Sequence, residues 1–135
     1  MVKIIVAALS GTIVYFLAGW LVFEGLLGTY MNANTTQIPG FKKSAEESGM
    51  VLLLVSCAAY ALLLALVFGY WTNVRTFWEG AKLGALIGIL VAVMTDSYWF
   101  STTHFFNGPA PLLADVAAAG ITVGLMGGVV ARMLG

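Results

Sequence analysis

The chain carries very little charge and almost no cysteine. Charged residues make up 9% of its 135 residues, against roughly 25% in a soluble domain. Six Lys or Arg balance six Asp or Glu, so the formal net charge is zero, which gives no electrostatic basis for binding nucleic acid or for a polybasic lipid anchor. Cys57 is the only cysteine. This excludes a disulfide within the chain and a cysteine metal site, and we expect Cys57 to be a small packing residue.

The sequence patterns of common catalytic and nucleotide-binding sites are also absent. The chain has no G-x-S-x-G, no H-E-x-x-H and no P-loop, so we expect neither an enzyme nor a bound cofactor. His104 is the only histidine, which argues against a haem held by two histidines. Carboxylate and imidazole side chains can hold a metal ion, but their spacing here does not predict one.

Long apolar segments make up nearly all of the chain, in which 61% of residues are hydrophobic. Four segments reach the roughly 20 residues that a helix needs to cross a bilayer; they are residues 3–28, 49–71, 76–103 and 111–132. The first is too long for the apolar region of a signal peptide, so we expect a retained helix. The pattern predicts an all-α protein, an integral membrane four-helix bundle formed by residues 1–135 as a single domain, with two antiparallel hairpins.

Basic residues near the ends of these segments predict the orientation. With four spans, both termini share one side with the loop at 72–75, and the basic residues on that side are Lys3, Arg75, Lys82 and Arg132. The other side has Lys42 and Lys43. The positive-inside rule therefore predicts cytoplasmic termini. Ser44 with Glu47, and Thr76 with Glu79, are spaced as capping boxes before the second and third helices.

Glycine recurs at every fourth position in two neighbouring helices. The rows are Gly80, Gly84 and Gly88 in the third helix and Gly120, Gly124 and Gly128 in the fourth. Such rows let helix backbones approach closely inside a membrane. We expect the two rows to pack against each other, which would leave a cleft at the opposite ends of these helices. The alternative is a face for self-association in a homo-oligomer.

Three carboxylates lie within apolar segments, where a charge is costly unless it faces an interior or a water-filled cavity. These are Glu24, Asp96 and Asp115, and His104 follows close to the same end of the helices. Asp96 continues the glycine row of the third helix. Asp115 is expected to point at the first helix, with Glu24 as its neighbour, or at a partner subunit. We expect these four residues to bind a proton or a cationic ligand, since two carboxylates in a low-dielectric site tend to share a proton.

Each of the four also has a simpler interpretation. Asp115 lies near the start of a helix, where a carboxylate complements the helix dipole. Glu24 would serve equally as a neutral hydrogen-bonded acid or as a headgroup contact, and His104 as an interfacial histidine. Asp96 is the deepest of the four and the hardest to explain in this way.

Three short stretches carry a resemblance to known proteins. They are Gly19-Trp20, the segment from Gly80 to Gly88, and Gly127-Gly128. On these the chain resembles a family of small four-helix bacterial inner-membrane proteins of unknown function. Between Leu21 and Leu27 it lacks the proline typical of the family. The resemblance implies a four-helix integral membrane protein in the bacterial inner (plasma) membrane and no particular activity.

The sequence thus favours a small transport or binding protein in a lipid bilayer. Four short helices enclose little space, so a pathway would require a homo-oligomer. The alternative is a structural or accessory subunit of a larger membrane complex, whose glycine rows would bind partner helices.

Overall fold

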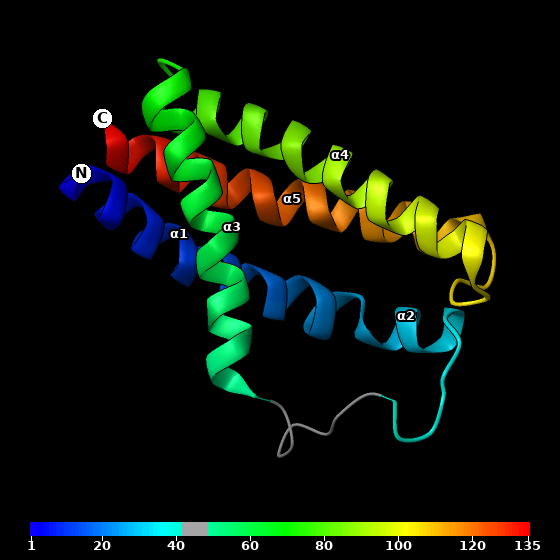
Figure 1. The fold of residues 1–135 in the computed structure, drawn as a ribbon. Coiled ribbons are helices and arrows are strands. Elements are labelled where there is room, and N and C mark those ends of the chain that lie inside the picture. Colours follow the sequence, from blue (N-terminus) through cyan, green and yellow to red (C-terminus); the bar gives the residue numbers. More distant parts are fainter. Residues whose placement is uncertain (42–48) are drawn as a thin grey trace.

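The computed structural model describes residues 1–41 and 49–135, and within these the chain is helical (Figure 1). The elements are α1 (Val2–Gly19), the π-helix η1 (Trp20–Leu26), α2 (Gly28–Asn34), α3 (Met50–Trp71), α4 (Phe77–Thr102) and α5 (Pro109–Leu134). In this described part of the chain, four helices are long and apolar enough to cross a membrane: Val2–Leu26, Met50–Trp71, Phe77–Thr102 and Pro109–Leu134. The predicted segments are confirmed as helices compatible with a membrane bundle.

The first helix does not end near residue 28 as predicted. It widens into the π-helix η1, in which Leu27 N–H donates to the Val22 carbonyl five residues back at 2.9 Å. It then continues as α2 to Asn34. The predicted connection at 29–48 therefore begins as a helix, and only the residues after Asn34 leave it.

The α4–α5 pair is held together by its glycines, and the two helices lie side by side (Figure 1). A Cβ added to Gly84 would lie 2.6 Å from the Val123 carbonyl oxygen, and one added to Gly88 would lie 2.8 Å from that of Ala119. Gly120 and Gly124 face Ile89 and Ala85 of α4. The expected packing of α4 against α5 within the chain is therefore present at these glycines.

Two details of this contact differ from the expectation. Gly127, which lies outside the predicted row, makes the closest backbone approach, to Gly80 and Gly84. Gly128 instead accommodates the Phe77 ring, whose Cε2 would lie 2.6 Å from an added Cβ. The α5 contact therefore follows Gly120, Gly124 and Gly127. A strict four-residue row drifts by about 40° per step, and the three-residue step returns it to the same face.

The core lies where α1, α3 and α5 meet. Leu64 and Phe68 of α3 and Met126 and Val130 of α5 are fully buried there. Gly11 of α1 allows the approach, because a Cβ at this position would lie 2.6 Å from Val130 Cγ2. Buried Cys57 is confirmed as a packing residue.

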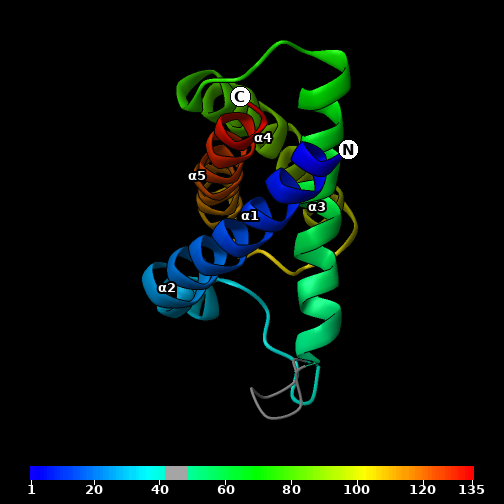
Figure 2. The same cartoon turned by 90° about the vertical axis from the view of Figure 1, so that its left-hand side faces the viewer.

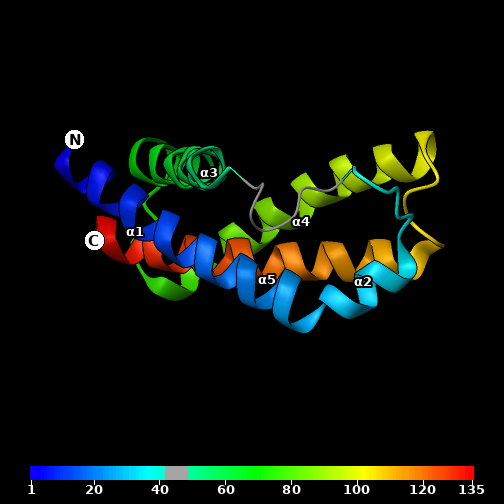
Figure 3. The same ribbon diagram turned by 90° about the horizontal axis from the view of Figure 1, so that it is seen from below.

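Helix α3 crosses the others steeply. Figure 2 shows α1 running diagonally past it, and Figure 3 shows α3 nearly end-on while α1 and α5 run across the view. Its first seven residues, Met50 to Ser56, are exposed, and its packing begins at Cys57. The predicted two-hairpin arrangement and the cytoplasmic position of the termini stay predictions.

Both termini lie at one end of the molecule, close to the α3–α4 connection (Figure 1). Thr76 caps α4 as predicted, since its Oγ1 accepts from Glu79 N–H at 3.3 Å. The predicted Ser44–Glu47 box, with Lys42 and Lys43, lies outside the described residues.

Arg75 closes the carboxyl end of α3. Its guanidinium donates to the carbonyls of Phe68, at 2.8 Å, and of Gly69, at 3.3 Å. The last carbonyls of a helix lack partners within the helix, and a cation there also complements the helix dipole.

Replacing Arg75 with methionine keeps the apolar stem but removes these donors. We expect Arg75→Met to lower the free energy of unfolding by about 1.5–3 kcal/mol, the usual range for hydrogen bonds from a charged group. The measurement is unfolding of the detergent-solubilised protein by titration with sodium dodecyl sulfate. Exposed Arg132, in the last turn of α5, is the control, and Arg132→Met should cost at most about 1 kcal/mol. Equal losses for the two variants would contradict the capping role.

Candidate functional site

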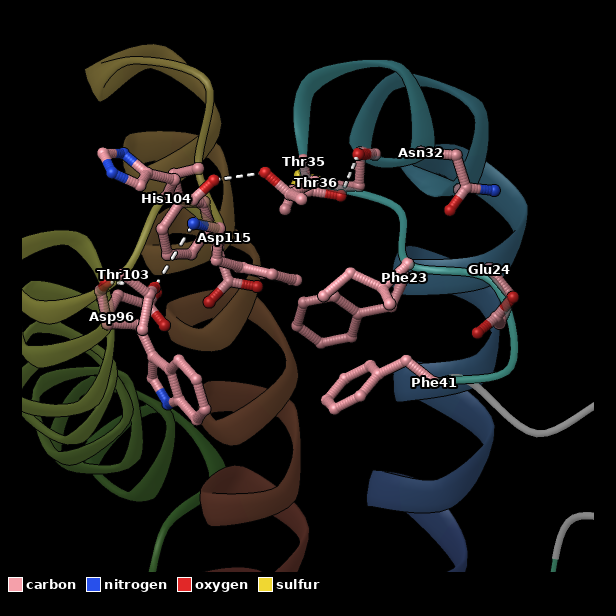
Figure 4. A pocket seen from close by; sticks show the side chains of 16 residues that line it. Phe23, Glu24, Asn32, Thr35, Thr36, Phe41, Asp96, Thr103, His104 and Asp115 are labelled. Carbon is pink, nitrogen blue, oxygen red and sulfur yellow. Dashed lines mark hydrogen bonds between the residues drawn. The ribbon is translucent and has the colours of Figure 1, made fainter.

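A cavity of about 700 Å³ lies at the end of the molecule opposite the termini. Its walls come from η1 and α2 on one side and from α4 and α5 on the other, with the α4–α5 loop closing the end (Figure 4). The residues that line it include Glu24, Asp96, His104 and Asp115. The structure thus brings all four predicted residues to one cavity, which we call the aspartate cavity. The cleft was expected between the ends of α4 and α5. The cavity has a further wall, which is formed by η1 and α2.

Asp96 is the most buried of the four. Gly80, Gly84, Gly88, Ala92 and Asp96 are all buried on one side of α4, so the four-residue spacing carries this aspartate onto the packed side of the helix. Only 8% of its surface is exposed. Its Oδ2 atom has no hydrogen-bond partner among the described residues. An unpaired buried carboxylate is costly, so this atom is poised for a proton or a ligand.

Asp115 of α5 lines the same cavity, and Figure 4 shows its carboxyl group near that of Asp96. Asp115 is half-buried. Two carboxylates so close cannot both ionise without repulsion, so the pair is suited to share one proton. The expectation that Glu24 neighbours Asp115 is wrong, because Asp96 occupies that position.

Glu24 and His104 belong to the rim of the cavity. Both are exposed. Figure 4 places Glu24 across the cavity from the two aspartates and shows the His104 imidazole turned away from them. The His104 carbonyl accepts a hydrogen bond from Thr36 Oγ1, so this residue contributes its backbone to the structure of the rim.

A backbone clasp closes the cavity between the end of α2 and the α4–α5 loop. Thr36 N–H donates to the Phe105 carbonyl at 2.7 Å, and Asn107 N–H donates to the Asn34 carbonyl at 2.8 Å. Together they form a short antiparallel bridge between Thr35 and Phe106. The sequence did not predict this clasp, because its two halves are far apart in the chain and neither carries a strand pattern.

A smaller cavity of about 180 Å³ continues from Asp115 into the middle of the bundle. Tyr15 of α1 and Tyr60 of α3 line it, with ring centroids 5.3 Å apart in an edge-to-face arrangement. The Tyr60 hydroxyl is buried and has no partner among the described residues. The sequence analysis did not predict this cavity. Two tyrosines in the middle of otherwise apolar helices could have indicated it.

Among residues 1–41 and 49–135, no three His, Cys, Asp or Glu side chains are grouped closely enough to hold a metal ion. Comparison of the chain with models of protein families, with curated proteins and with solved structures found no match. The geometry of the aspartate cavity is therefore the basis for assigning a function.

Proposed function

We propose that this chain is a small membrane binding or transport protein whose Asp96–Asp115 pair takes up a proton or a cationic ligand. The observation that carries the proposal is the unpartnered Oδ2 atom of buried Asp96 in a cavity of about 700 Å³. A purely structural aspartate at this depth would be expected to have its oxygens paired, because burial of an unpaired charge in a membrane is expensive.

The lining supports a positively charged occupant. Three acidic residues, Glu24, Asp96 and Asp115, are among the described residues that line the cavity, and none of these lining residues is Lys or Arg. Such a lining produces a negative potential that attracts cations. Glu24 at the rim would meet a ligand before it reached the pair, and His104 would support the rim through its backbone carbonyl.

The proposal also includes a setting for the protein. We place it in the bacterial inner membrane with both termini cytoplasmic, so that the aspartate cavity lies near the external surface, and in a homo-oligomer whose copies complete a pathway. The alternative role as an accessory subunit is less favoured. The glycine rows that were to bind partner helices are occupied within the chain.

Labelling with a hydrophobic carbodiimide tests whether the pair holds a proton. This reagent reacts with protonated carboxyl groups in apolar surroundings. We expect one adduct on the Asp96–Asp115 pair of the wild type, with a rate that falls as the pH rises. Asp96→Asn should lower the rate at least about tenfold, because the amide carries no acidic proton for the reagent and the carboxyl pair that would share a proton is lost.

Glu79→Gln is the matched control, since Glu79 is an exposed carboxylate on the same helix. It should label as the wild type does when adducts are counted by intact mass and located by peptide mapping. Two results would contradict the proposed role of the pair. One is equal labelling of wild type and Asp96→Asn, and the other is wild-type protein that carries as many adducts on Glu79 as on the pair.

A further inference from the structure

The aspartate cavity has an aromatic lining as well as an acidic one. Trp99 and Phe105 have ring centroids 6.3 Å apart, and Phe105 and Phe106 have centroids 5.0 Å apart, so the three form a continuous aromatic wall. Figure 4 shows the Phe23 and Phe41 rings extending across the cavity toward Asp96 and Asp115. An occupant next to the carboxylates would therefore also touch aromatic rings.

This combination does not suit an inorganic ion. Calcium takes six to eight oxygen ligands, and magnesium prefers near-octahedral oxygen coordination, whereas aromatic rings supply no ligand atoms. A cation with hydrocarbon substituents uses both parts of the lining. Its charge is attracted by the carboxylates and by the faces of the rings, and its substituents bury against the rings. A volume of about 700 Å³ lies within the range of sites for drug-sized molecules.

We propose that the ligand of the aspartate cavity is a hydrophobic organic monocation, an ammonium or phosphonium group carrying aryl or alkyl substituents. This inference rests on the proposed function and names its ligand class. The carboxylate pair supplies the counter-charge, so the proton that the pair shares leaves to solvent when the cation binds. Binding is therefore an exchange of one proton for one cation.

The experiment uses the full-length protein in lipid nanodiscs and three probes, with empty nanodiscs subtracted. Tetraphenylphosphonium carries the charge and the aryl groups. Tetraphenylborate has the same shape and the opposite charge, and tetramethylammonium has the charge without the rings. We expect saturable binding of tetraphenylphosphonium with release of about one proton per cation, no saturable binding of tetraphenylborate, and at least about tenfold weaker binding of tetramethylammonium.

Two tryptophans on α4 provide a matched pair of variants. Trp99 lines the cavity, whereas Trp78 lies near the other end of the helix and is 72% exposed. Trp99→Leu should weaken tetraphenylphosphonium binding by about 2- to 30-fold, the range expected for loss of one cation–π contact. Trp78→Leu should leave it unchanged.

The outcomes separate this inference from the proposed function. If tetraphenylborate binds as well as tetraphenylphosphonium, or if the two tryptophan variants behave alike, the organic cation is excluded. Asp96-dependent carbodiimide labelling would then still support the proposed function with another cation. If the labelling and the binding are both indifferent to Asp96→Asn, the proposed function fails together with the inference.

Discussion

Gly84→Ala is expected to destabilise the protein by about 1–3 kcal/mol, the usual cost of forcing one methyl group into a packed interface. The new Cβ would lie 2.6 Å from the Val123 carbonyl oxygen and 3.0 Å from Gly127 Cα. Both atoms belong to the backbone of α5, so no side chain can rotate away to make room. The helices must separate, and the dispersion contacts that hold them together inside a membrane weaken as they do.

Gly19→Ala is the control that isolates this steric effect. Gly19 also lies in a membrane-compatible helix, but nothing is found within 4 Å of the added Cβ. Alanine there should be neutral or should stabilise the protein by up to about 1 kcal/mol through its higher helix propensity. Both variants are measured by unfolding with sodium dodecyl sulfate. A Gly84→Ala protein as stable as Gly19→Ala would refute the close backbone packing.

The same substitution should also affect the site. Asp96 is three turns further along α4 from Gly84 and lies on the same packed side of the helix. Moving α4 away from α5 would separate Asp96 from Asp115 and lower the carbodiimide labelling as well. The glycine row therefore sets the distance between the two aspartates, on which the proposed function depends.

The sequence predicted the helices because a membrane imposes a length and a polarity on each span. It also predicted the α4–α5 contact, since glycine rows on two consecutive helices can be read from spacing alone. The steep crossing of α3 has no such signal. Because α3 is apolar all round, no stripe of its sequence indicates which face packs.

The site was predicted in part. Asp96 was expected to be buried because it continues a row of small residues, and it is buried. The pairing of Asp96 with Asp115 was not predicted. Glu24 lies in η1, where the wider turns of a π-helix point side chains in other directions than an α-helix would. The amino-acid composition does not predict a π-helical segment. The clasp at Thr35 and Phe106 is a contact between distant parts of the chain, which local patterns cannot reveal.

A disulfide across that clasp is the second change for which we expect a large effect. The bonds from Thr36 to Phe105 and from Asn107 to Asn34 flank the pair Thr35 and Phe106. Such a non-hydrogen-bonded pair has Cα atoms about 4.5 Å apart, within the range that a disulfide spans. In a Cys57→Ala background, Thr35→Cys with Phe106→Cys should therefore cross-link on mild oxidation.

The cross-link closes a loop of about 70 residues, so the oxidised form should be more stable than its own reduced form by up to about 4 kcal/mol.

The effect of the cross-link on binding should be kinetic. If the cation enters between α2 and the α4–α5 loop, the cross-link should slow both association and release of tetraphenylphosphonium. The affinity should be nearly the same as that of the reduced form of the same variant, which lacks the Phe106 ring as well. Thr36→Cys with Phe106→Cys is the control, because neighbouring residues of an extended segment point to opposite faces. Equal cross-linking of both pairs would mean that the clasp is not held in one register. Unaltered exchange in the cross-linked protein would place the entrance elsewhere, on the lipid-facing side between η1 and α4.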